Sequence, residues 1–154
     1  MKKQSVTLPG KIESRLPQLL SFLLPFCIVT ICYIVAKVFP FGNRQILASD
    51  GWHQYYPFLR ELQLLLKEGS LPFYSWNVGG GSNFLGVMGN YLASPLYLFT
   101  YFLPSGHIWL QMYLAFTVAL RIGCAGGFMA IFLRKVFNRN DLSLVYFSIM
   151  YALC

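Results

Sequence analysis

The feature that most constrains this chain is a long segment without formal charge. No Asp, Glu, Lys or Arg occurs from Ser70 to Leu120. In the whole chain 11% of residues are charged and 56% are hydrophobic, whereas soluble domains have about 25% charged residues. Such a sequence could hardly form a water-exposed surface, and its hydrophobicity excludes intrinsic disorder. The composition therefore predicts an integral membrane protein.

Two apolar runs are long enough to cross a bilayer as helices. Residues 16–36 carry no charge, and residues 107–133 carry only Arg121. Because about 20 helical residues span the hydrocarbon core, both runs predict transmembrane helices. Pro25 in the first run predicts a kink. A cleavable signal peptide is the rival for the first run, but its apolar core would be about 7–15 residues long and would end at a small-residue cleavage site.

The basic residues predict the orientation of the chain. The net charge is +7, and Lys and Arg concentrate in residues 1–15 and 134–141. The positive-inside rule places both segments in the cytoplasm, so residues 37–106 are predicted to face outside. Residues 84–103 are apolar but interrupted by Gly, Asn and Pro. If they crossed the membrane, the second basic segment would lie outside, so we predict that they rest on or dip into the outer face.

The chain ends in an uncharged apolar run, residues 142–154, which is shorter than a membrane span. We interpret it as the truncated start of a third transmembrane helix, and expect residues 1–154 alone to be inactive. Alternation typical of strands is absent, so the predicted fold class is an all-α polytopic membrane protein. The basic residues are few and scattered, which excludes nucleic-acid binding and leaves membrane lipids as partners.

Within the predicted outer segment, residues 51–68 have the pattern of an amphipathic helix. Its apolar and polar side chains occupy opposite faces: Phe58, Leu59, Leu62, Leu65 and Leu66 against Arg60, Gln63 and Lys67. This spacing is typical of a helix lying on a membrane surface. Gly69 is placed to cap its C-terminus.

Asp50, just before this helix, is the first candidate for chemistry. It is the only Asp in the first 140 residues. A carboxylate among aromatic side chains could have a raised pKa and act as a general base, or it could cap the helix that follows. His53, three residues on, would share its helical face and could contact a substrate. One Asp and one His do not make a metal site, so no metal or other cofactor is predicted.

The remaining candidates are a glycine run, an arginine in the middle of the second span and an aromatic residue. Gly79, Gly80 and Gly81 lack the Lys-Ser/Thr of a P-loop, so they indicate either a turn or a backbone that approaches a phosphate or sugar. Arg121 in the second span would be costly unless it faces protein or a polar cavity, where it could meet an anionic group. Tyr55 fits an interfacial aromatic belt or, alternatively, sugar stacking.

Three segments in order resemble the YfhO family of bacterial membrane proteins. Residues 49–58 match the pattern Asp-x-x-x-Gln-Tyr-x-Pro-Phe with Asp50, Gln54 and Tyr55. A glycine-rich loop at residues 77–84 follows, and then the segment Asn90-Tyr-Leu-Ala-Ser-Pro-Leu96. The resemblance covers nearly the whole chain.

This resemblance implies a GT-C-like membrane glycosyltransferase of Gram-positive bacteria. Such an enzyme would use a polyprenyl-phosphate sugar donor on the outer face, with a teichoic acid, especially lipoteichoic acid, as acceptor. The catalytic acid commonly lies in the first outer loop, where Asp50 stands, and that loop carries juxtamembrane helices. The family pattern and the candidates above together give the expected substrate-binding residues: His53, Gln54, Tyr55, Arg60, Gly79, Gly80, Gly81, Asn90 and Arg121.

The implied mechanism is inverting transfer. Asp50 would deprotonate an acceptor hydroxyl, and Arg60 or Arg121 would balance the charge of the leaving polyprenyl phosphate. A paired Asp-x-Asp is absent, so the sequence does not support a divalent metal. The alternative is a non-enzymatic lipid or cell-envelope polymer transporter or assembly protein, which would use the same outer helix and Arg121 to hold a lipid phosphate. Either protein would be a multi-pass protein of the cell membrane with a cytoplasmic N-terminus.

Overall fold

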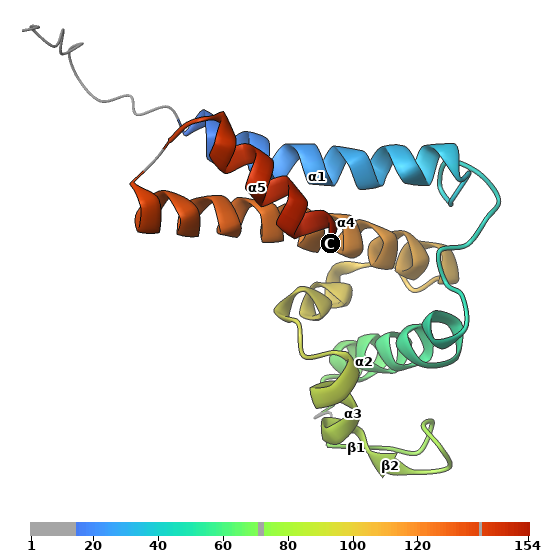
Figure 1. The fold of residues 1–154 in the computed structure, drawn as a ribbon. Helices are drawn as coiled ribbons and strands as arrows, with labels where there is room; N and C mark the ends of the chain where they lie inside the picture. Colours follow the sequence, from blue (N-terminus) through green and yellow to red (C-terminus); the bar gives the residue numbers. More distant parts are fainter. Residues whose placement is uncertain (1–14, 71–72, 139) are drawn as a thin grey trace, which may run out of the picture. The chain divides into compact units, whose positions relative to one another are not determined.

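The computed structural model describes residues 15–70, 73–138 and 140–154, and its described residues are mostly helical (Figure 1). Two β-strands of two residues each accompany the helices. In chain order the elements are α1 (Leu16–Val35), the π-helix η1 (Gly51–Tyr55), α2 (Tyr56–Glu68), β1 (Tyr74–Ser75), β2 (Ser82–Asn83), α3 (Phe84–Tyr91), the 3₁₀-helix η2 (Pro95–Phe102), α4 (His107–Phe137) and α5 (Leu142–Leu153).

The chain divides into two compact units. One comprises the residues up to Ile28 and from Arg121 to Cys154, and the second comprises Val29 to Leu120. The long helices α1 and α4 each contribute residues to both units. The second unit holds all of the predicted outer segment together with the first half of α4.

Helices α1 and α4 are each long and apolar enough to cross a membrane. They lie where residues 16–36 and 107–133 predict spanning helices, although α4 continues to Phe137 and so includes Arg134 and Lys135. The sidedness of the predicted segments stays a prediction. Residues 1–14 and Arg139, which belong to the predicted cytoplasmic segments, lie outside the described residues.

In the first unit, α1 and α4 pack closely along a line of small residues. Pro25 has no N–H, so the carbonyl of Ser21, four residues earlier in α1, receives no helical hydrogen bond from it. Gly126 of α4 lies directly against that carbonyl, and a Cβ on Gly126 would collide with its oxygen. A Cβ on Gly123 would likewise lie only 3.1 Å from the nearest atom of Phe22. Small residues therefore allow the two backbones to approach, as is common between membrane helices.

The second unit has its own hydrophobic core. Four side chains with no exposed surface form its centre: Leu59 and Leu62 of α2, Phe84 of α3 and Leu110 of α4. The predicted helix over residues 51–68 is present as η1 followed by α2, and its apolar face enters this core. Gly69 ends α2 in the left-handed conformation, with φ 69°, as predicted.

The polar stripe of α2 is partly buried, which differs from the predicted helix lying on a membrane surface. Gln63 is fully buried, and its Nε2 donates to the carbonyls of Thr100 at 3.0 Å and Leu103 at 3.2 Å. Lys67 Nζ also donates to Leu103 O, at 2.6 Å. The end of η2 therefore covers Gln63, whereas Lys67 remains exposed while it donates to Leu103 O.

Residues 84–103 form two short helices, α3 and η2, and not one helix of spanning length. Asn83 caps α3 by accepting from the Gly86 N–H at 3.3 Å, and Pro95 begins η2. Side chains also satisfy carbonyls in the first part of η2. Thr100 Oγ1 donates to Tyr97 O at 2.6 Å, and the Tyr113 hydroxyl donates to Leu96 O. Their position relative to a bilayer stays a prediction.

Candidate functional site

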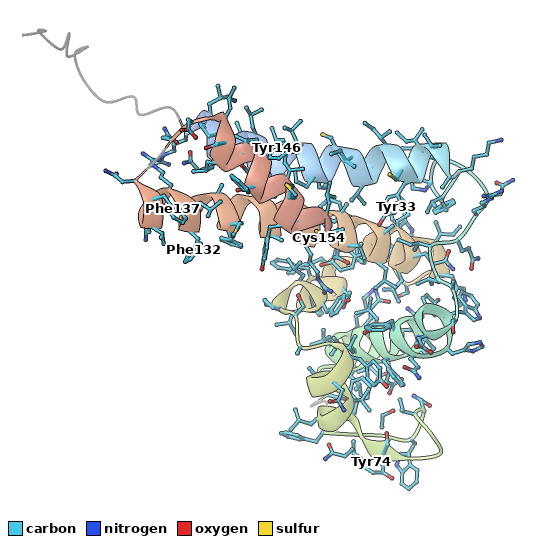
Figure 2. The ribbon with its side chains drawn as sticks, viewed as in Figure 1. Tyr33, Tyr74, Phe132, Phe137, Tyr146 and Cys154 are labelled. Carbon is cyan, nitrogen blue, oxygen red and sulfur yellow. The ribbon has the colours of Figure 1, made fainter. Side chains whose placement is uncertain are left out.

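A pocket of about 410 Å³ lies in the second unit, between α2 and the turn of the β1–β2 hairpin. Its walls combine charged, amide, imidazole, aromatic and apolar groups: His53, Tyr56, Pro57, Phe58, Arg60, Glu61, Asn77, Val78 and Gly79. Figure 2 shows the side chains and labels Tyr74 on the hairpin. The volume falls in the range of about 300–1,000 Å³ that is usual for small-ligand sites.

Three of the sequence-predicted site residues meet at this pocket: His53, Arg60 and Gly79. The other candidates do not line it. In the second unit these are Asp50, Gln54, Tyr55, Gly80, Gly81 and Asn90. Tyr55 instead packs edge-on against Tyr91 of α3, with ring centroids 5.5 Å apart. Arg121 lies midway along α4 and belongs to the first unit, so the structure does not associate it with the pocket.

Glu61 and Asn77 are wall residues that the sequence analysis missed. Glu61 is only 6% exposed, and its carboxylate accepts from Ser75 Oγ at 2.6 Å. Asn77 Nδ2 donates to both of its oxygens, at 3.2 and 3.0 Å. These bonds fasten the hairpin to α2. The sequence signal that could have indicated Glu61 is its place as an acidic residue on the border of the apolar face, next to Arg60.

The three glycines lie in the turn of the β1–β2 hairpin, and one of them lines the pocket. Gly79, Gly80 and Gly81 have φ values of 61°, 76° and 119°, which residues that carry a side chain rarely adopt. A Cβ on Gly81 would also collide with the Tyr74 hydroxyl. The glycines therefore form a tight turn, and Gly79 additionally lines the pocket.

Asp50 is exposed and makes no helix-capping hydrogen bond with its side chain. It precedes η1, whose π-helical turns hold more residues than α-helical ones. The expectation that Asp50 and His53 share one helical face assumed α-helical spacing, so it does not apply to this segment. The carboxylate is thus open to solvent, and the capping interpretation of Asp50 receives no support from its side-chain contacts.

Tyr56 connects the pocket to the start of α4. Its hydroxyl hydrogen-bonds with His107 Nδ1, and its ring stacks with the rings of Trp52 and His107 at centroid distances of 5.4 and 5.8 Å. Burial raises the pKa of the Tyr56 phenol, and the nearby Arg60 guanidinium lowers it in part. The phenol therefore stays neutral at physiological pH and can donate to the imidazole.

Arg60 is the cation of the pocket wall. Its Nη1 donates to Gln63 Oε1 at 2.6 Å, which orients the guanidinium by way of the buried Gln63 side chain. A guanidinium has five N–H donors in a fixed fork and matches phosphate geometry. Among the described residues, no three His, Cys, Asp or Glu side chains come together as metal ligands.

The fold and the pocket define a helical membrane protein with a polar site in the segment between its first two long helices. The family model of the bacterial membrane protein YfhO matches residues 21–154. This chain therefore belongs to the YfhO family. Neither the search of curated proteins nor that of solved structures gave a match.

Proposed function

We propose that this chain provides the first outer segment of a GT-C-like membrane glycosyltransferase. The enzyme moves a sugar from a polyprenyl-phosphate donor to a cell-envelope acceptor such as lipoteichoic acid, on the outer face of the cell membrane. The observation that carries the proposal is the pocket beside Arg60, because it combines the groups that a sugar phosphate requires.

Each part of the sugar phosphate has a counterpart in the pocket wall. The Arg60 guanidinium supplies charge and directed donors for the phosphate. Phe58 provides apolar ring surface for a sugar face, and His53 provides a ring nitrogen for its hydroxyls. Gly79 lacks a side chain, so a ligand can approach the hairpin backbone closely.

The carboxylate of Glu61 lies in the pocket wall, whereas Asp50 does not line the pocket, and the two have different roles in this proposal. Glu61 is buried and engaged by Ser75 and Asn77, so it is a positioning residue that holds the hairpin against α2. Asp50 is exposed and makes no capping bond, so its lone pairs are open to an acceptor hydroxyl. Asp50 is therefore proposed as the general base.

The transfer step balances as an inverting displacement. The acceptor oxygen forms a bond to the anomeric carbon while the bond from that carbon to the phosphate oxygen breaks. Asp50 takes the acceptor proton, and the electron pair of the broken bond leaves with polyprenyl phosphate. Arg60 stabilises the charge that develops on the leaving phosphate.

The test is the variant Asp50→Asn in the intact membrane-embedded protein, assayed for sugar transfer from a radiolabelled polyprenyl-phosphate sugar. Removal of a general base lowers the rate by about 10²–10⁴-fold. Membrane abundance should be unchanged, because the Asp50 side chain makes no capping bond. Glu68→Gln, an exposed acidic position at the end of α2, is the matched control and should keep full activity.

Near-full turnover by Asp50→Asn would show that another residue is the base. If the unaltered protein transfers no sugar and the Arg60→Gln variant blocks the movement of a lipid or polymer across the membrane, the protein is a transporter or assembly factor. Transfer that is lost in Asp50→Asn and weakened in Arg60→Gln supports the enzyme.

A further inference from the structure

Two cavities in the first unit share two wall residues and are together called the groove. The first, of about 330 Å³, follows α1 and α4 and has mostly apolar walls that include Leu19, Phe22, Gly127 and Phe128. The second, of about 350 Å³, lies at the end of α4 beside Arg134 and Lys135. Gln18 and Ile131 line both cavities, so the apolar cavity adjoins the polar one.

The apolar part of this groove has the chemistry of an acyl-chain site. Its wall includes Gly127 and the Phe22 and Phe128 side chains. An unfilled groove between membrane helices loses dispersion contacts on its walls, because no atoms face them at contact distance. A flexible hydrocarbon chain would restore those contacts.

The polar end of the groove is basic. Arg15 lines the first cavity, and Arg134 and Lys135 line the second, while no acidic residue of the described part of the chain lines either one. Basic side chains at the ends of membrane helices reach toward the headgroup level. Three cations beside an apolar groove are therefore complementary to a single anionic headgroup.

Gln18, which lines both cavities, carries a side-chain oxygen that lacks a hydrogen-bond donor in the part of the chain that the structure describes. Its Nε2 donates to Asn140 Oδ1 at 3.1 Å, while its Oε1 is buried with no hydrogen-bond partner among the described residues. A buried acceptor without a donor is unfavourable, so a ligand that brings a hydroxyl to this point would be favoured.

We propose that this groove binds one anionic phospholipid of the bilayer whose headgroup carries a hydroxyl. Its phosphate lies among Arg15, Arg134 and Lys135, its headgroup hydroxyl donates to Gln18 Oε1, and one acyl chain follows the seam of α1 and α4. The site is separate from the sugar-phosphate pocket, so this inference does not depend on glycosyl transfer.

Native mass spectrometry of the intact protein tests the proposal. The protein is reconstituted in vesicles that contain equal amounts of phosphatidylglycerol and phosphatidylcholine, and is then extracted with mild detergent. One phosphatidylglycerol molecule should be retained in preference to phosphatidylcholine. The double variant Arg134→Gln/Lys135→Gln should bind it about 30-fold more weakly, because each basic side chain near the headgroup contributes about a factor of five.

Two double variants serve as matched controls. Lys37→Gln/Arg44→Gln removes the same charge from exposed positions of the second unit and should leave lipid retention unchanged. Arg134→Lys/Lys135→Arg keeps the charge and should also retain the lipid, which separates lost binding from lost folding.

Three outcomes would overturn the proposal. The first is equal retention of both lipids, or of neither, as when another part of the intact protein covers the groove. The second is unchanged retention in the charge-removing variant. The third is displacement of the lipid by inorganic phosphate alone, which would show that the cations bind free phosphate without need of the acyl-chain groove.

Discussion

Replacement of Glu61 by Ala should release the hairpin from α2 without unfolding the rest of the protein. Its carboxylate is the acceptor for Ser75 Oγ and for Asn77 Nδ2, and these bonds join the two walls of the pocket. The variant leaves the buried Ser75 hydroxyl without this acceptor. The hairpin should therefore open more often, and the Asn77 and Gly79 side of the pocket should lose its fixed position.

The expected change in the free energy of hairpin opening follows from the two partners of the Glu61 carboxylate. A hydrogen bond to a charged group contributes about 1.5–3 kcal/mol, and water entering from the pocket replaces part of each bond. We therefore expect the free energy of local opening to fall by about 2–4 kcal/mol. Glu61→Gln keeps an acceptor for Ser75 but turns an NH₂ group toward Asn77, so we expect about half of that loss.

Hydrogen–deuterium exchange of the intact protein measures this change. Amides of the hairpin, such as the Gly81 N–H that donates to Val78 O, should exchange about 30-fold to 1,000-fold faster in Glu61→Ala. Amides of α1 serve as the internal reference. Glu68→Gln, in the same helix but exposed, should change hairpin exchange by less than a factor of about three. Unaltered hairpin exchange in Glu61→Ala would refute the anchoring role.

Two further perturbations test the packing and the topology. Gly126→Ala should lower the free energy of unfolding by about 1–2 kcal/mol, because overpacking against the Ser21 carbonyl outweighs the gain in helix propensity. The control Gly86→Ala should not lower it, because a Cβ at that position meets no heavy atom within 4 Å. Equal melting temperatures for the two variants would contradict this packing. A cysteine introduced at the exposed Ser105 should react with a membrane-impermeant reagent only from outside, whereas labelling only from the cytoplasm would show that residues 84–103 cross the membrane.

The long helices and the end of α2 could be predicted because their signals are local. Uninterrupted apolar runs mark α1 and α4, and a glycine that can adopt a positive φ at position 69 ends α2. The strands escaped detection because β1 and β2 have two residues each, which is too short for alternation. The π-helical turn before α2 likewise has no periodic signature.

The pocket was only partly predictable, because its walls come from contacts between distant residues. Arg60, His53 and Gly79 were candidates for their chemistry alone, and the structure brings them to one pocket. The bond from Asn77 to Glu61 joins residues 16 positions apart, and nothing in either residue indicates the pairing. Gln63 was placed on the polar face of a helix at the membrane surface, because periodicity defines the faces of a helix but not what covers each face.

Protein donors pair with carbonyls of η2, and this affects which environment the helix can occupy. Four large apolar side chains project outward from it: Leu98, Phe99, Tyr101 and Phe102. On the protein side, Gln63, Lys67 and Tyr113 supply donors to its peptide oxygens. Peptide groups with protein donors do not require water, and dehydration by hydrocarbon then carries little penalty. A short 3₁₀-helix of this kind can enter the acyl region of a leaflet from one side and still keep its backbone intact, without crossing to the other side.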